Sequence, residues 1–429
     1  MKNVVVIGNG IAGISAALHI RRYSDYHITI ISAESEHFYS RPALMYLYMG
    51  HLTAAHVKPY EDWFWQKNRL TLKLAYIESI DANRKTLLLQ HNETMSYDTL
   101  IIASGSKSNM FGWEGQELEG VQGLYGLPDL HKMQRNTLNI SRAVIVGGGL
   151  IGVEMAEMLL SRGIGVTFLV REKNYWDNVL PIEEAMMIER HLQSHGIDLR
   201  LETNLLKITA DANGKAKLVI TDKGEEIPCQ FVGISTGVSP NVDFLRNSGI
   251  GLNKGVLVNE FLETNVPDIY AIGDCAELIK PSVGRKAIEP VWYTGRIMGE
   301  TLAKTITGTR TVYEPGVWYN SAKFFNIEYQ TYGFVSNQLQ PGEQTCCWQE
   351  PKKEKLLRIN YSEKERNVTG VNALGIRISQ KVCEKWIKEK RSIDYAMEHL
   401  QDANFEPEFS KTYHREIKEH FSRSLLMEH

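Results

Sequence analysis

Two short apolar runs each lead into a glycine-rich turn and then a helix-like stretch. The first run is VVVI (4–7) and the second is AVIV (143–146). Unbroken apolar runs of this length are typical of strands buried on both faces of a parallel sheet. A second such run follows each helix-like stretch, at HITIISAE (27–34) and VTFLV (166–170). The pattern predicts two β-α-β units, each the start of a doubly wound parallel sheet.

The rest of the chain continues both kinds of pattern. Strands are predicted at LIIAS (100–104), between residues 201 and 237, and at DIYAIGD (268–274), which we expect to return to the first sheet. Helices are predicted for IEEAMMIERHLQSHG (182–196), which ends at a glycine, and from about residue 290 to 308. Beyond Tyr313 the pattern predicts hairpins followed by helices rich in Lys and Glu.

Both glycine-rich turns carry the spacing G-x-G-x-x-G. The glycines are Gly8, Gly10 and Gly13 in the first turn and Gly147, Gly149 and Gly152 in the second. After a buried strand, the first glycine allows a tight turn, the second lets the backbone approach a pyrophosphate, and the third lets the helix pack on the strand. The helix N-terminus then offers free N–H groups to the phosphates. One chain is therefore expected to bind two dinucleotides.

Composition and charge narrow the class of protein. The 429 residues are 43% hydrophobic and 23% charged, with a net charge of −3, as in ordinary globular proteins of several domains. This balance argues against a nucleic-acid partner held by bulk charge. No apolar stretch approaches the roughly 20 residues that span a bilayer. The first apolar run leads directly into the glycine turn, so we predict no signal peptide, no membrane partner and a cytoplasmic location.

The five cysteines are scattered and begin late in the chain. They are Cys229, Cys275, Cys346, Cys347 and Cys383. None forms a C-x-x-C motif or has zinc-ligand spacing with histidine, so we predict reduced thiols and no metal site.

Several further segments carry a family resemblance. They are GNGIAG (8–13) with Glu34, FYSRPAL (38–44), YDTLIIASG (97–105), GGGLIGVEMAE (147–157), GISTGVSPN (233–241) and NVPDIYAIGDCAE (265–277). In these the chain resembles the FAD/NAD(P)H-dependent pyridine-nucleotide oxidoreductases, most closely the ferredoxin, rubredoxin and nitrite reductase branch. The resemblance implies an α/β fold with two Rossmann-like three-layer domains, as in glutathione reductase, and a C-terminal α/β interface domain. The implied domains are FAD-binding (1–110 and 238–312), NAD(P)H-binding (111–237) and C-terminal (313–429).

For FAD, the resemblance implies a set of binding residues drawn from most of these segments. Glu34 would accept the adenosine ribose hydroxyls, Arg41 would offset the pyrophosphate charge, and Asp274 would accept hydrogen bonds from the ribityl and phosphate region. The full set is Gly8, Gly10, Ile11, Ala12, Gly13, Glu34, Arg41, Pro42, Ile77, Ala103, Ser104, Gly105, Gly273, Asp274, Pro290 and Val291.

For NADH or NADPH, the implied set centres on the second glycine turn. It comprises Gly147, Gly149, Leu150, Ile151, Gly152, Arg171, Glu172 and Gly237. Arg171 could pair with the 2′-phosphate of NADPH, whereas Glu172 could accept the ribose hydroxyls of NADH, so the sequence leaves the donor open.

Two residues are catalytic candidates. Glu154 matches the residue that the family places beside the nicotinamide. Tyr46 stands where this branch often has a lysine near the reactive flavin nitrogen.

The predicted function is an FAD-dependent NAD(P)H oxidoreductase. Disulfide reductases of the family carry their thiol near residues 40–50, where this chain has RPALMYLYMGH (41–51) and no cysteine. We therefore expect electrons to pass directly to a small redox protein of the ferredoxin or rubredoxin type. An NADH oxidase or quinone-type reductase, and a redox-controlled binding module with little turnover, are the alternatives. The C-terminal domain would support a homodimer or the docking face.

Overall fold

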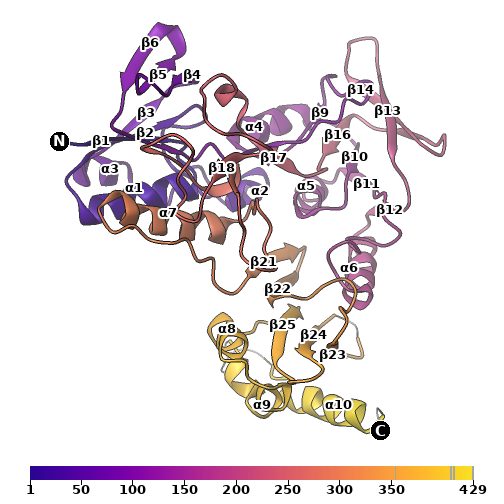
Figure 1. Cartoon of the computed structure of the whole chain (residues 1–429). Helices are drawn as coiled ribbons and strands as arrows, with labels where there is room; N and C mark the ends of the chain where they lie inside the picture. Colours follow the sequence, from indigo (N-terminus) through magenta and orange to yellow (C-terminus); the bar gives the residue numbers. More distant parts are fainter. Residues whose placement is uncertain (353, 406–407, 409–410, 428–429) are drawn as a thin grey trace. The chain divides into compact units, whose positions relative to one another are not determined.

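The structure is a computed structural model that describes residues 1–352, 354–405, 408 and 411–427 (Figure 1). Parallel and antiparallel sheets alternate with helices, so the fold is α/β, as the sequence predicts. The chain divides into two compact units. The first comprises Met1–Phe111, Gln122–Asn139 and Thr236–Pro315, and the second comprises Gly112–Val121, Ile140–Ser235 and Gly316–His429.

A five-stranded parallel sheet forms the centre of the first unit. Its order is β19-β7-β1-β2-β3. The strands are β1 (Asn3–Ile7), β2 (His27–Ser32), β3 (Leu70–Leu74), β7 (Thr99–Ile102) and β19 (Ile269–Ala271). Val4, Val5 and Val6 of the central strand are fully buried because both faces of a parallel sheet are covered. Since the strands are parallel, the segments that follow β1, β7 and β19 meet at one edge of the sheet.

Helices α1 (Ile11–Tyr23) and α7 (Trp292–Ile306) lie side by side against this sheet (Figure 1). Their backbones approach closely because Gly299 faces α1: a Cβ atom there would lie 2.6 Å from the Ala12 carbonyl oxygen. The shorter helices of the unit are α2 (Leu44–Tyr48), α3 (Asp62–Lys67) and α4 (Leu127–Asn136). Helix α7 thus brings a late segment of the chain to the first glycine turn.

Small sheets complete the first unit. Strands β4 (Ile77–Asp81), β5 (Thr86–Leu89) and β6 (Glu93–Ser96) form an antiparallel meander. Two further pairs are β8 (Ser106–Ser108) with β17 (Val238–Pro240), and β18 (Val256–Val258) with β20 (Ala276–Leu278).

The second unit contains another five-stranded sheet, in the order β12-β11-β10-β16-β9. Its strands are β9 (Val121–Gln122), β10 (Arg142–Val146), β11 (Gly165–Leu169), β12 (Asp198–Arg200) and β16 (Phe231–Ile234), and those from β12 to β16 run parallel. Helix α5 (Leu150–Leu160) connects β10 to β11, and helix α6 (Ile182–Ser194) lies between β11 and β12 in the chain. An antiparallel sheet of β13 (Leu205–Ala210), β14 (Ala216–Thr221) and β15 (Glu226–Pro228) packs its apolar side chains into the same core.

The C-terminal part of the second unit is an antiparallel sheet with helices, as the sequence predicts. The strand order is β21-β22-β25-β24-β23. The strands are β21 (Tyr319–Phe324), β22 (Ile327–Gly333), β23 (Glu343–Gln349), β24 (Leu356–Ser362) and β25 (Val368–Leu374). The helices are α8 (Gln380–Lys388), α9 (Ile393–Glu398) and α10 (His414–Met427). Cys383 of α8 is fully buried in this core.

A buried ion pair connects helix α6 to the C-terminal sheet of the second unit. Arg358 of β24 donates to both carboxylate oxygens of Glu184 on α6, at 2.7 and 3.0 Å. The Glu184 side chain is fully buried and that of Arg358 is 5% exposed. Arg358 also pairs with Glu183 at 2.7 Å, so removing Arg358 would leave the buried Glu184 carboxylate unpaired, at a cost of about 3–5 kcal/mol. The pair therefore fixes α6 against the C-terminal sheet.

Within the part of the chain that the structure describes, no helix is both long and apolar enough to cross a membrane.

Candidate functional site

The first glycine turn follows β1 directly and is held in place by backbone contacts. The Gly8 N–H donates to the Ile31 carbonyl oxygen at 2.8 Å, and Gly8 has a φ of +105°. A Cβ on Gly8 would overlap the Ala103 carbonyl oxygen, and one on Gly13 would overlap that of Gly8. Side chains are therefore excluded at both positions.

Gly10 is different because its surroundings are open. It is the N-cap of α1, with extended backbone angles and no side-chain cap, and a Cβ placed on it would meet no atom within 4 Å. Helix α1 begins at Ile11. The N–H groups of its first residues, among them Ile11 and Ala12, have no partner within the helix. This bare helix N-terminus fits the pyrophosphate of a dinucleotide.

Other predicted FAD residues gather at the same sheet edge. Ala103, Ser104 and Gly105 follow β7, and Gly273 follows β19. A Cβ on Gly273 would lie 2.8 Å from the Ala12 side chain, so the segment carrying Asp274 touches the start of α1. Pro290 and Val291 precede the first turn of α7. The structure thus brings together segments that are far apart in the sequence.

Glu34 and Arg41 form an ion pair with each other. Arg41 Nη2 donates to Glu34 Oε2 at 2.9 Å, and the side chains are 30% and 21% exposed, respectively. Glu34 Oε1 also accepts the Tyr39 hydroxyl and, at 2.7 Å, the Leu127 N–H. A carboxylate has about four lone-pair sites, and Oε2 accepts only one of these donors. Glu34 Oε2 thus has a lone pair left that could accept a ribose hydroxyl.

Asp274 is held by a tyrosine. The Tyr125 hydroxyl donates to Asp274 Oδ2 at 3.1 Å and accepts the Ser106 N–H at 2.8 Å. Burial raises the pKa of Asp274, and the hydrogen bond from Tyr125 works in the opposite direction by stabilising the carboxylate.

The second glycine turn repeats the geometry of the first. The Gly147 N–H donates to the Leu169 carbonyl oxygen at 2.9 Å, and Gly147 has a φ of +102°. A Cβ on Gly152 would lie 2.6 Å from Ser235 Oγ, so the helix packs closely there. Gly149 is the N-cap of α5, and a Cβ on it would come no closer than 3.6 Å to any atom, the Ser235 carbonyl oxygen. Leu150 and Ile151 form the first turn of this helix.

The two glycine turns have the same hydrogen-bond register with the neighbouring strand. This register shows which residue of the second unit is equivalent to Glu34 of the first. Gly8 bonds to Ile31 and Gly147 bonds to Leu169. Counting three residues onward from these strand residues gives Glu34 in the first unit and Glu172 in the second. Glu172 is 19% exposed and accepts Arg171 Nε at 2.8 Å, while Arg171 is 74% exposed. Glu172 therefore occupies the position equivalent to Glu34.

Glu154 lies on α5 shortly after the second turn and is partly buried. Burial, and then the nearby charge of Glu157, raise its pKa to about 7. Glu157 in turn pairs with Lys323 of β21 at 3.3 Å. The carboxyl of Glu154 consequently holds its proton up to near-neutral pH.

Replacing Glu154 by glutamine should change how stability depends on pH. Because the pKa of Glu154 is about 7 in the folded chain and near 4.5 in the unfolded chain, the folded state binds the proton more tightly between these values. The free energy of unfolding of the natural protein should therefore fall as pH rises from about 4.5 to 7, by up to about 3 kcal/mol. Urea unfolding at pH 5 and pH 8 measures this, with E154Q relatively more stable at pH 8.

The matched control is Glu226→Gln, which changes an exposed glutamate of the same unit. Its curve should run parallel to that of the natural protein. A parallel curve for Glu154→Gln as well would show that the Glu154 carboxyl does not titrate near pH 7.

The remaining predicted residues are more dispersed. Tyr46 is half-buried on α2, with its ring 6.2 Å from that of His51. Pro42 is exposed beside Arg41, and Ile77 is buried at the start of β4. Gly237 groups with the first unit, where its carbonyl oxygen accepts the Asn109 N–H. Tyr46 and Glu154 lie in different units.

Sequence reasoning missed two tyrosines and a lysine near the predicted residues. They are Tyr39, Tyr125 and Lys323. Tyr39 stands within the FYSRPAL segment, two residues before Arg41, so the motif offered a signal for it. Tyr125 and Lys323 have no comparable signal, because their contacts are made with residues distant in the sequence.

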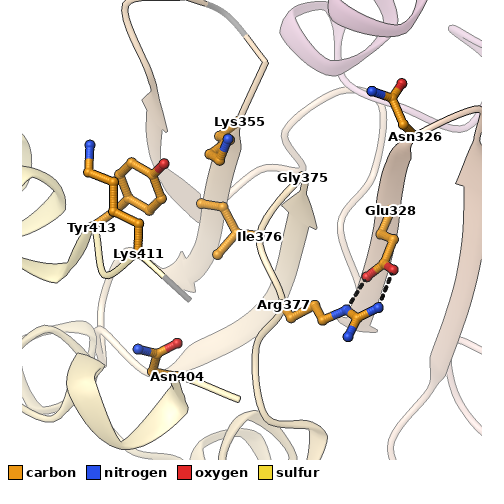
Figure 2. A pocket seen from close by; sticks show the side chains of 9 residues that line it. All are labelled: Asn326, Glu328, Lys355, Gly375, Ile376, Arg377, Asn404, Lys411 and Tyr413. Carbon is orange, nitrogen blue, oxygen red and sulfur yellow. Dashed lines mark hydrogen bonds and ion pairs between the residues drawn. The ribbon is translucent and has the colours of Figure 1, made fainter. Parts of the chain in front are cut away.

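A separate pocket of about 320 Å³ lies in the C-terminal part of the second unit (Figure 2). In it, Arg377 forms a bidentate pair with Glu328, both distances being 2.5 Å. The lining residues are Asn326, Glu328, Lys355, Gly375, Ile376, Arg377, Asn404, Lys411 and Tyr413. The set includes none of the residues predicted for either dinucleotide.

The cysteines offer no reactive thiol. Cys229, Cys275, Cys346 and Cys383 are buried and Cys347 is half-buried, all without disulfides. Burial raises the pKa of every one of them, for example that of Cys346 to about 11. The thiolate, which is the reactive form, is therefore disfavoured.

Known proteins match most of this chain. Rubredoxin-NAD(+) reductase of Ectopseudomonas oleovorans is 29% identical over 311 residues, covering 72% of this chain and 80% of that protein. An NADH oxidase of Methanocaldococcus jannaschii is 29% identical over 324 residues, covering 72% and 71%. Among solved structures, an NAD-dependent persulfide reductase from A. fulgidus has a TM-score of 0.83 at 26% identity and covers 92% and 78%.

The family comparison agrees with the two glycine turns. The family model for pyridine nucleotide-disulphide oxidoreductases matches residues 2–298, which include both turns and the segment around Asp274. The chain is accordingly an NAD(P)H oxidoreductase that binds FAD and NAD(P)H. On this match, the chain belongs to the pyridine nucleotide-disulphide oxidoreductase family.

Proposed function

We propose that this oxidoreductase passes electrons from NADH to a small iron–sulfur protein of the rubredoxin or ferredoxin type. The observation that carries the proposal is the absence of cysteine from the first 228 residues of a chain with two dinucleotide turns. Its similarity to rubredoxin-NAD(+) reductase along 80% of that enzyme supports the choice of acceptor.

A thiol relay is disfavoured by the state of the cysteines. Thiol–disulfide exchange needs an accessible thiolate. The five cysteines lie at residue 229 or later, four are buried, and burial raises the pKa of each thiol. Electrons therefore leave without passing through a cysteine of this chain.

The residues of the chain bind and orient the two cofactors. When bound, the nicotinamide supplies a hydride and the flavin can release the electrons singly. The bare N-termini of α1 and α5 hold the two pyrophosphates through backbone N–H groups and the helix dipole. Glu34 and Asp274 fix the first dinucleotide at the ribose and ribityl positions, and Glu172 fixes the second. Glu154 keeps a proton at its carboxyl near the second turn.

Rapid mixing of the purified flavoprotein tests the proposal. We expect NADH to bleach the flavin rapidly, and oxidised rubredoxin or ferredoxin to restore its colour much faster than a quinone or dioxygen does. Prior alkylation with iodoacetamide should leave both rates unchanged. Fast reduction followed by indifference to every acceptor would overturn the proposal and favour a redox-controlled binding protein.

An NADH oxidase is the second candidate, since the Methanocaldococcus jannaschii relative carries that name. For this function, oxygen consumption should match NADH oxidation in the absence of any iron–sulfur protein. Adding rubredoxin or ferredoxin would then leave the rate of NADH oxidation unchanged.

A further inference from the structure

One short turn contacts the carboxylates at both ends of the predicted FAD site. The Leu127 N–H donates to Glu34 Oε1 at 2.7 Å, and the Tyr125 hydroxyl donates to Asp274 Oδ2 at 3.1 Å. We call residues 125–127 the clasp turn. It leads directly into α4, and its residues stand outside the segments that suggested a nucleotide site.

Tyr125 is enclosed by residues of the predicted FAD site. The Arg41 guanidinium lies 4.5 Å from the centre of its ring, and Arg41 Nη1 donates to the Tyr125 carbonyl oxygen at 2.8 Å. Its hydroxyl accepts the Ser106 N–H. A Cβ on Gly105 would lie only 2.8 Å from the hydroxyl oxygen. The phenol therefore links Arg41 to Asp274 through a single rigid side chain.

The clasp turn is itself fixed. Asp129 Oδ2 accepts the N–H groups of Tyr125, at 2.8 Å, and of Gly126, at 3.1 Å. A Cβ on Gly126 would overlap Glu34 Oε1 and would lie 3.0 Å from Arg41 Nη1. The turn and the carboxylate thus fit together only because residue 126 is glycine.

The chemistry of the phenol suits the task. Burial raises the pKa of Tyr125, so its hydroxyl stays protonated and remains a donor to Asp274. A hydrogen bond to a buried carboxylate favours the ionised form, which is the form that accepts hydrogen bonds from a ligand. The donor and the carboxylate are both mostly buried, where such a bond is strong.

We propose that Tyr125 is an FAD-positioning residue, which holds Asp274 and Arg41 in place while the same turn holds Glu34. The proposal rests on the assignment of Glu34, Arg41 and Asp274 to FAD. It is independent of the electron acceptor, because it concerns how firmly FAD is held.

Release of FAD from the holoprotein on dilution, followed by flavin fluorescence between pH 5 and 8, tests the proposal. Tyr125→Phe keeps the ring and removes the hydroxyl, so the dissociation constant of FAD should rise about 10- to 100-fold. Without this donor the Asp274 carboxyl protonates at a higher pH, so FAD should also be released at a higher pH than in the natural protein.

Tyr97→Phe is the matched control. Tyr97 is a buried tyrosine of the same unit whose hydroxyl has no hydrogen-bond partner among the described residues. Its variant should hold FAD as the natural protein does. If Tyr125→Phe behaves like Tyr97→Phe, or releases FAD equally at every pH, the proposal is wrong.

Two further variants separate positioning from folding. In an Asp274→Asn background, adding Tyr125→Phe should change FAD affinity less than about threefold, because both changes remove the same interaction. Asp129→Ala removes the acceptor that anchors the clasp turn from outside the site and should raise the dissociation constant about threefold or more. If the effects of the Tyr125 and Asp274 variants on the dissociation constant multiply fully, or if Asp129→Ala binds FAD as the natural protein does, the proposal is wrong.

Discussion

Replacing Gly10 by alanine should yield a folded protein that has lost its FAD. The backbone at Gly10 is extended with a negative φ, and a Cβ there meets no protein atom within 4 Å, so the fold has room for a methyl group. A pyrophosphate that approaches the backbone at this point has no such room. One extra methylene in a tight pocket changes discrimination between ligands by about 10- to 200-fold, and the new methyl group would lie at the predicted point of closest approach to the pyrophosphate. The absorbance ratio of flavin to protein measures the loss.

Two other glycines provide the controls. Gly149 has the equivalent place in the second turn, so Gly149→Ala should keep its FAD but be reduced slowly by NADH in rapid mixing. Gly8 has a φ of +105° and no space for a Cβ, so Gly8→Ala should fail to fold. Retention of FAD by Gly10→Ala, with circular dichroism unchanged, would show that the pyrophosphate lies elsewhere.

The two glycine turns and the elements around them could be predicted from the sequence because the patterns that indicate them are local. A run such as VVVI, a glycine spacing and a following helix lie within about 20 residues, and each depends on the covalent geometry of adjacent residues. The sequence therefore predicts both parallel sheets, the helices after each turn and the late return of β19 to the first sheet, all of which the topology confirms.

The contacts that complete the site are not local, and the sequence does not predict them. Tyr125 and Asp274 are separated by 149 positions, and Arg358 and Glu184 by 174. A tyrosine in a glycine-rich connection or an arginine in a strand has no periodic pattern to indicate its partner. The ion pair between Glu34 and Arg41 was not predicted for another reason. Each residue was assigned separately to a part of the cofactor, Glu34 to the ribose and Arg41 to the pyrophosphate.

The choice between Arg171 and Glu172 depends on the hydrogen-bond register at the end of β11, because one residue is a cation and its neighbour is a carboxylate. From sequence alone the end of the strand is uncertain by a residue or two, which is enough to exchange a cation for a carboxylate. The hydrogen bond from Gly147 to Leu169 fixes the register and gives Glu172 the position that Glu34 has in the first unit. This register supports our proposal that the donor is a nucleotide without a 2′-phosphate.

Glu172→Gln should accordingly lower kcat/KM for NADH by about 10- to 100-fold, because a charge-assisted hydrogen bond to the ribose is lost. Activity with NADPH should rise instead, since the carboxylate no longer repels the 2′-phosphate. Initial rates with both nucleotides and a saturating acceptor measure the change. Because both nucleotides reduce the same flavin, a general loss of folding or of FAD would lower the two rates together.

The neighbouring Arg171→Gln is the matched control. Arg171 is 74% exposed, and its pair with Glu172 should be worth no more than about 1 kcal/mol, so NADH activity should change less than about fivefold. The contrary result is a natural protein that prefers NADPH, with Arg171→Gln abolishing that preference. In that case the Arg171 guanidinium binds the 2′-phosphate, and the equivalence of Glu172 with Glu34 does not determine the donor. The two variants differ by one position in the chain, so the experiment asks directly which side chain faces the nucleotide.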